Sequence, residues 1–97
     1  FDTSAVRAMF ESIDDEGYAA CCAAIQHMDQ SASLGAIAAP TLVIAGAQDP
    51  ATPPAHARRI AAAIPNARLE VLDPGAHLVN VERPEAVTHL IIEHLEG

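Results

Sequence analysis

The sequence contains no lysine and no tryptophan, and its positive side chains are five arginines against thirteen acidic residues. The resulting net charge of −8 leaves no basic stripe that could neutralise a phosphate backbone, so we expect no nucleic-acid partner. Docking on anionic lipid also requires clustered lysine or arginine. Because no apolar run approaches the roughly 20 residues of a membrane-spanning helix, we expect no membrane partner either.

Aromatic residues are scarce as well, at 3% of the 97 residues, although hydrophobic residues together make up 51%. This composition excludes a disordered chain and predicts a thin core of alanine and short aliphatic side chains. The two cysteines, Cys21 and Cys22, are adjacent, a spacing at which a mutual disulfide is strained. We therefore expect reduced thiols that pack as small apolar residues on a buried helix, in a cytoplasmic protein.

The start of the chain carries no targeting signal. The residues from Phe1 onward lack the charged start and the apolar stretch of a secretion signal. Phe1 also stands where an initiator methionine would, which predicts that the chain is a segment of a longer protein.

Hydrophobic spacing divides the chain into a helical front and an α/β back. In the front, apolar residues recur three or four positions apart, which predicts an amphipathic helix that begins near Asp15. Its apolar stripe consists of Tyr18, Cys21, Cys22, Ile25 and Met28. A shorter helix is predicted around residues 6–13.

The back alternates strands with helices. Residues 40–46, PTLVIAG, form an unbroken apolar run that is typical of a strand covered on both faces. Residues 68–72 alternate polar and apolar side chains and predict a second strand. The connection is long enough for a helical crossover, so we expect the strands to be parallel. Two parallel strands need neighbours, which predicts either a homo-oligomer or a missing N-terminal part of the fold.

Two helices complete the α/β pattern. The first is expected after Thr52, a plausible N-cap, and the second from about Pro84. The predicted inward faces are Ala57, Ile60, Ala61 and Ile64 in the first helix and Val87, Leu90, Ile91 and Leu95 in the second.

Asp49 and His77 are the candidate catalytic residues. Asp49 follows the first predicted strand and His77 the second, and the carboxyl ends of parallel strands are where such sheets carry their sites. A carboxylate that hydrogen-bonds to an imidazole orients the general base of a catalytic triad. Two alternatives stay open: Asp49 could serve only to cap its own loop through an Asx turn, and Asp73 could be the acid instead.

The motifs around these two residues resemble the C-terminal part of an α/β-hydrolase. They are PTLVIAGAQDP with the following PP, in residues 40–54, and GAHL with ERPE, in residues 75–85. The resemblance implies that Asp49 is the triad acid and His77 the general base. It also implies a C-terminal β-α-β-α part of the hydrolase core, with parallel strands, at residues 36–97.

The front resembles one group of these enzymes more closely. Residues 16–25, EGYAACCAAI, are similar to the last cap helix of the 3-oxoadipate enol-lactonases, which implies the end of a helical cap at residues 1–35. Those bacterial enzymes open an enol-lactone in the catabolism of aromatic compounds. The resemblance therefore implies a small lactone or ester substrate, with neither a cofactor nor a metal.

A serine nucleophile is the part of such a site that the sequence lacks. In the family it occupies a Gly-Xaa-Ser-Xaa-Gly turn upstream of the acid and the base. None of the serines has that frame; they are Ser4, Ser12, Ser31 and Ser33. We therefore expect the parent protein to catalyse and the 97-residue chain to be inactive alone. Another capped hydrolase, such as an esterase or a carbon–carbon hydrolase, and a non-catalytic interaction module are the alternatives.

Other ionisable residues predict no separate site. His89 and His94 are five positions apart and fall on different faces of a helix, so they do not predict a metal site. His89 and Glu93, four positions apart, predict an exposed pair instead. The loop after Gly46 lacks the further glycines of a dinucleotide-binding motif. Arg7 is the candidate anchor for an anionic substrate.

Overall fold

The computed structural model describes residues 2–97 and divides the chain into two compact units. The first unit ends at Gln30, and the second runs from Ser31 to Gly97. Within residues 2–97, no helix combines the length and the apolar character that crossing a bilayer would require.

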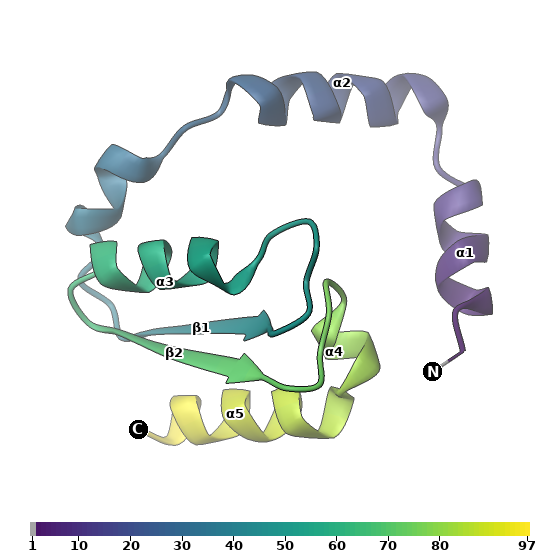
Figure 1. Cartoon of the computed structure of the whole chain (residues 1–97). Coiled ribbons are helices and arrows are strands. Elements are labelled where there is room, and N and C mark those ends of the chain that lie inside the picture. Colours follow the sequence, from purple (N-terminus) through teal and green to yellow (C-terminus); the bar gives the residue numbers. More distant parts are fainter. Residues whose placement is uncertain (1) are drawn as a thin grey trace. The chain divides into compact units, whose positions relative to one another are not determined.

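The first unit consists of two helices, α1 (Ser4–Glu11) and α2 (Asp15–His27), labelled in Figure 1. Asp14 begins α2 as its N-cap, because its carboxylate accepts a hydrogen bond of 2.8 Å from the backbone N–H three residues further on. The rings of Phe10 and Tyr18 meet edge to face, with centroids 5.5 Å apart. Both helices predicted from hydrophobic spacing are thus confirmed.

The apolar stripe of α2 does not form a buried face. Cys21 and Cys22 are exposed free thiols, so the prediction that they pack on a buried helix is wrong. Within this unit α1 does not pack along α2, and α2 has no buried residue, so nothing in the unit covers the stripe.

The second unit is built on two strands, β1 (Thr41–Gly46) and β2 (Ala67–Leu72). They are parallel and pair residue for residue along their whole lengths, as predicted. Figure 1 shows α3 (Pro54–Ala63) on one face of the strands and α5 (Pro84–Glu96) on the other, and both helices contact β1. The parallel pairing brings the carboxyl ends of both strands to one edge, from which the loops after them extend.

Two short elements flank this layer structure. A 3₁₀ helix, η1 (Ser31–Ala36), precedes β1 and contacts α3. A four-residue helix, α4 (Val79–Glu82), fills the connection between β2 and α5. The sequence pattern did not predict α4, because one helical turn is too short to show a hydrophobic period.

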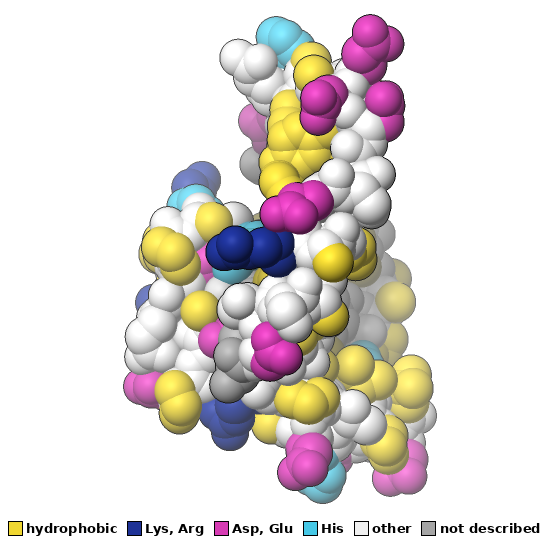
Figure 2. Space-filling model, turned by 90° about the vertical axis from the view of Figure 1, so that its right-hand side faces the viewer, with side chains coloured by type: hydrophobic (Ala, Val, Ile, Leu, Met, Phe, Trp, Pro, Cys, Tyr) yellow, Lys and Arg dark blue, Asp and Glu magenta, His cyan; other side chains and the backbone are white. Residues whose placement is uncertain are grey.

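The core of the second unit is thin, as the composition predicts. The buried apolar residues are Ala45, Ala57, Ile64, Val79 and Val87. Figure 2 shows apolar side chains at the surface among carboxylates, and Leu95, predicted to face inward from α5, is 77% exposed. The inward face of α5 is therefore confirmed at Val87 and wrong at Leu95 and at Ile91, which is 44% exposed. Val87, in the first turn, is the one buried residue of α5, and the second unit leaves the later turns of this helix uncovered.

The inward face of α3 also differs in part from the prediction. Ala57 and Ile64 are buried, whereas Ile60 is 41% exposed. At about 100° per residue, Ile60 is rotated roughly 60° from Ala57, which puts it at the edge of the stripe. Thr52 is not the N-cap of this helix: Pro53 takes that position, and the Thr52 hydroxyl bonds elsewhere.

Gly46, the last residue of β1, lies directly against the loop after β2. A Cβ added to it would overlap the carbonyl oxygen of Ala76 and would lie only 2.6 Å from the carbonyl carbon of Gly75. All of these neighbours are backbone atoms, which cannot turn away as a side chain can. The absence of a side chain at Gly46 is what allows the two loops to approach each other.

We expect Gly46→Ala to lower the free energy of unfolding by about 2 kcal/mol or more, because the added methyl group forces these backbones apart. Urea unfolding of the 97-residue chain, followed by circular dichroism, measures the effect. Gly35→Ala is the matched control, because the nearest atom to its added Cβ is 3.9 Å away. Equal losses in the two variants would contradict the close approach at Gly46.

Candidate active site

The loops after β1 and β2 bring the two candidate catalytic residues into contact. Asp49 and His77 are 28 positions apart in sequence, and Oδ2 of the carboxylate lies 3.0 Å from Nδ1 of the imidazole. A carboxylate only accepts hydrogen bonds, so Nδ1 carries the proton and donates. This is the geometry that the parallel arrangement of the strands led us to expect.

Asp49 is the single buried charged residue among residues 2–97, and its carboxylate is held by hydrogen bonds on both oxygens. Oδ1 accepts from the backbone N–H groups of Ala51 and Thr52, at 2.9 and 3.0 Å. Oδ2 accepts from the Thr52 hydroxyl at 2.9 Å as well as from His77. The Asx-turn alternative and the dyad are therefore both realised, because each engages a different oxygen of the same carboxylate.

These contacts decide the charge of Asp49. Burial of the carboxylate raises its pKa, but hydrogen bonds from Thr52, His77 and Ala51 lower the pKa by more, so it lies well below the ordinary value of 3.8. Asp49 is thus an anion throughout the physiological range. An anion beside Nδ1 stabilises the positive charge that the imidazole acquires when it takes a second proton.

The lowered pKa of Asp49 predicts a loss of stability in acid. The unfolded chain takes up a proton at Asp49 near pH 3.8, whereas the folded chain does so only at lower pH, so the stabilisation is present above about pH 4 and disappears below it. In Asp49→Asn, the free energy of unfolding should fall less between about pH 5 and pH 2. Urea unfolding at several pH values measures this slope, and equal slopes in the two proteins would contradict the prediction.

His77 is placed to act on a molecule outside the chain. Its side chain is 56% exposed, in contrast to that of Asp49, which is 6% exposed. Its Nδ1 faces the carboxylate, and none of residues 2–97 hydrogen-bonds to Nε2. With the proton held on Nδ1, Nε2 carries a free electron pair and can accept a proton from a nucleophile.

Asp73, the rival acid, is engaged elsewhere. Its Oδ1 accepts a hydrogen bond of 2.9 Å from Nε2 of Gln48. The structure therefore joins His77 to Asp49 and gives Asp73 a different partner, although Asp73 is only four positions from His77 in sequence.

Several side chains that the sequence pattern did not single out hold the loop that carries His77. Gln48 accepts a hydrogen bond from the N–H of Gly75, and Glu82 accepts one from the N–H of Ala76, both at 2.9 Å. The Arg83 guanidinium donates to the carbonyl oxygen of the residue before Gly75, at 2.7 Å. Glu82 and Arg83 belong to the ERPE motif, which is the one sequence signal for these residues. The motif indicated the family resemblance but did not predict the contacts that its side chains make.

Two of the remaining candidates, His89 and His94, have hydrogen-bond or ion-pair partners outside the dyad. His89 and Glu93 form the predicted exposed pair on α5, 3.2 Å apart. His94 turns to the carbonyl oxygen of Pro40, at 3.2 Å, and the described part of the chain contains no cluster of three potential metal ligands. Arg7 lies on α1 in the first unit, and its role as an anion anchor stays a prediction.

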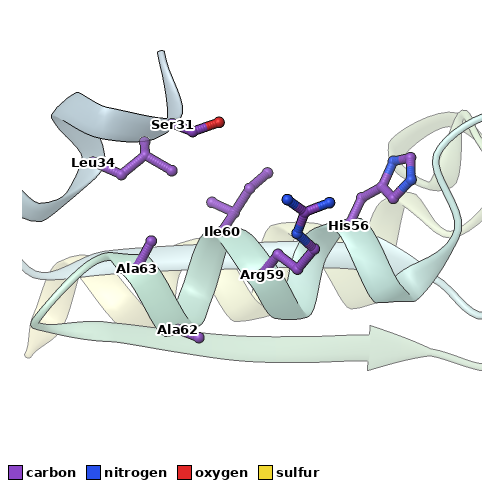
Figure 3. Close-up of a pocket in the computed structure, with 7 residues that line it drawn as sticks. All are labelled: Ser31, Leu34, His56, Arg59, Ile60, Ala62 and Ala63. Atoms are coloured by element: carbon purple, nitrogen blue, oxygen red, sulfur yellow. The ribbon is translucent and has the colours of Figure 1, made fainter. Parts of the chain in front are cut away.

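An open hollow of about 590 Å³ lies between η1 and α3 (Figure 3). Its lining comprises Ser31, Leu34, His56, Arg59, Ile60, Ala62 and Ala63. In Figure 3 the side chains of His56, Arg59 and Ile60 point away from the strands. Neither member of the dyad lines this hollow, so the geometry assigns it no part in the chemistry of Asp49 and His77.

Comparison with known proteins decides the family. The family model described as alpha/beta hydrolase fold matches residues 12–84. The chain belongs to the α/β-hydrolase family. It is 45% identical over 76 residues to 3-oxoadipate enol-lactonase 2 of Acinetobacter baylyi, an alignment that covers 78% of this chain and 28% of that protein.

Solved structures of α/β-hydrolases agree with the fold. The enol-lactonase of Burkholderia xenovorans superposes with a TM-score of 0.89 and 38% identity, over 98% of this chain and 38% of that one. A hydrolase of Pseudomonas aeruginosa superposes with a TM-score of 0.87 and 42% identity, over 94% of this chain and 34% of that one. The predicted α/β-hydrolase fold is confirmed, and the chain spans about a third of the length of these relatives.

Proposed function

We propose that this chain supplies the acid and the base of a hydrolase that opens an enol-lactone, with 3-oxoadipate enol-lactone in aromatic-compound breakdown as the substrate. The observation that carries the proposal is the arrangement of His77, whose Nδ1 donates to the buried Asp49 while Nε2 stays open. The similarity to two enol-lactonases supports the choice of substrate.

In the proposed reaction, a serine from a part of the parent protein outside these 97 residues attacks the lactone carbonyl. His77 takes the serine proton on Nε2, and Asp49 stabilises the resulting imidazolium. His77 returns that proton to the ring oxygen, which leaves as an enol; the enol collapses to a ketone, so the oxygen departs without help from a metal. Water, activated by His77, then releases the acid from the serine.

We propose that residues 1–35 are the end of a helical cap and that the 97 residues have no activity alone, because no serine stands in a Gly-Xaa-Ser-Xaa-Gly turn. The remaining strands of the sheet would come from the N-terminal part of the parent protein. The free thiols of Cys21 and Cys22 support a reducing, cytoplasmic compartment.

A chimeric enzyme tests the proposed function. In it, this chain replaces the matching 38% of the Burkholderia xenovorans enol-lactonase, which keeps its own N-terminal part. We expect the chimera to hydrolyse 3-oxoadipate enol-lactone, followed by the loss of its ultraviolet absorbance, and the 97-residue chain alone to show no turnover. A folded chimera that cleaves aryl esters but not the enol-lactone would overturn the substrate, and one that cleaves neither would overturn the function.

A further inference from the structure

We propose that Gln48 is a positioning residue, which locks the loop carrying His77 onto the loop carrying Asp49. The inference rests on the proposed function in so far as it assigns a catalytic purpose to this lock. Gln48 immediately precedes Asp49, so its attachment to the other loop acts next to the dyad.

The lock begins with a reciprocal pair of hydrogen bonds between Gln48 and Gly75. The N–H of Gln48 donates to the carbonyl oxygen of Gly75 at 2.8 Å, and the N–H of Gly75 donates to Oε1 of the Gln48 side chain at 2.9 Å. The two bonds close a ring that joins the loops. Because Gly75 is two positions before His77 and Gln48 is next to Asp49, this ring lies close to the dyad along both loops.

The other end of the same amide holds Asp73. Nε2 of Gln48 donates to Oδ1 of Asp73 at 2.9 Å. These partners fix which way the amide points: the Asp73 carboxylate only accepts and the Gly75 N–H only donates. An amide is therefore the group that satisfies both at once. A glutamate at position 48 would set two carboxylates against each other, and a leucine would leave both partners unpaired.

The exposure of His77 explains why such a lock matters for catalysis. More than half of its side chain is exposed, so packing of the imidazole itself cannot define its position. The ring is held by its bond to Asp49 and by the path of its own loop. Misplacement of a catalytic group by about 1 Å can cost roughly 100-fold in rate.

Exchanging the amide and the carboxylate between positions 48 and 73 tests the proposal in the chimeric enzyme. We expect Gln48→Glu and Gln48→Leu to lower kcat by about 10- to 100-fold while KM changes by less than about threefold, because the base is displaced and substrate contacts are not. In the double variant Gln48→Glu with Asp73→Asn, the carboxylate introduced at position 48 accepts from both Gly75 and the new amide, so most of the lost kcat should return. Gln26→Leu, on the exposed surface of α2, is the matched control.

A kcat of Gln48→Leu equal to that of the unsubstituted chimera would overturn the positioning role, as would a double variant no better than Gln48→Glu alone. A second measurement does not depend on catalysis. Amide hydrogen exchange by nuclear magnetic resonance on the full 97-residue chain should show the Gly75 N–H exchanging about tenfold faster or more in Gln48→Leu. Unchanged exchange would overturn the lock itself, whereas an inactive unsubstituted chimera would overturn the proposed function and leave this measurement standing.

Discussion

Replacing His77 by alanine in the chimeric enzyme is expected to lower kcat by about 10,000-fold or more, because the reaction loses the base that takes the serine proton and later returns it. KM should change far less, since the imidazole contributes to the transition state more than to binding of the intact lactone. Single-turnover measurements with excess enzyme would show whether formation of the acyl-enzyme is the step that slows. Circular dichroism checks that the variant is folded.

His89→Ala provides the matched control for this prediction. His89 is also an exposed histidine paired with a carboxylate, but its partner Glu93 lies on the same helix and not in a loop that follows a strand. We expect this variant to keep the activity of the unsubstituted chimera. If His77→Ala kept more than about a tenth of the activity, His77 would not be the base.

The dyad could be predicted from the sequence because it depends on topology. Two strands with a helical crossover between them are parallel, and residues that directly follow parallel strands meet at one edge of the sheet. This topology was sufficient to predict that Asp49 and His77 lie within hydrogen-bond range of each other. The structure adds the distance, 3.0 Å, and the burial of one partner but not the other.

The hydrogen bonds around the dyad could not be predicted, because they depend on loop conformation, which has no sequence period. Thr52 fits an N-cap as well as it fits a donor to Asp49, and only the position of the Asp49 carboxylate separates the two roles. The partnership of Gln48 with Asp73 spans 25 positions and likewise leaves no pattern in the sequence. Side-chain hydrogen bonds of this kind are known only once the structure is known.

The errors in burial share a different cause. Helical spacing shows which residues lie on one face, and it does not show whether anything covers that face. Cys21 and Cys22 lie on the predicted stripe of α2 and are nevertheless exposed, and Leu95 lies on the predicted face of α5 and is exposed too. Burial depends on the elements that pack around a helix, and the hydrophobic spacing of the helix itself does not encode them.

The second large effect is expected for Asp49→Asn, which should lower kcat of the chimera by about 10,000-fold although the side chain keeps its size. The carbonyl oxygen of the introduced asparagine can still accept from the backbone N–H groups of Ala51 and Thr52, so the loop is retained. Its amide would present donors to His77 Nδ1, however, and the imidazole would then carry its proton on Nε2. A histidine in that tautomer cannot accept the proton of the serine.

Asp73→Asn separates this prediction from its rival. The substituted side chain can still accept from Gln48 through its carbonyl oxygen, so we expect a loss of less than about tenfold. Steady-state rates for the two variants, measured side by side at one pH, decide between the acids. A large loss in Asp73→Asn together with a small loss in Asp49→Asn would make Asp73 the acid, and the 3.0 Å bond between Asp49 and His77 would then serve only to order the loops. The burial of Asp49, its lowered pKa and its four hydrogen bonds favour the opposite result.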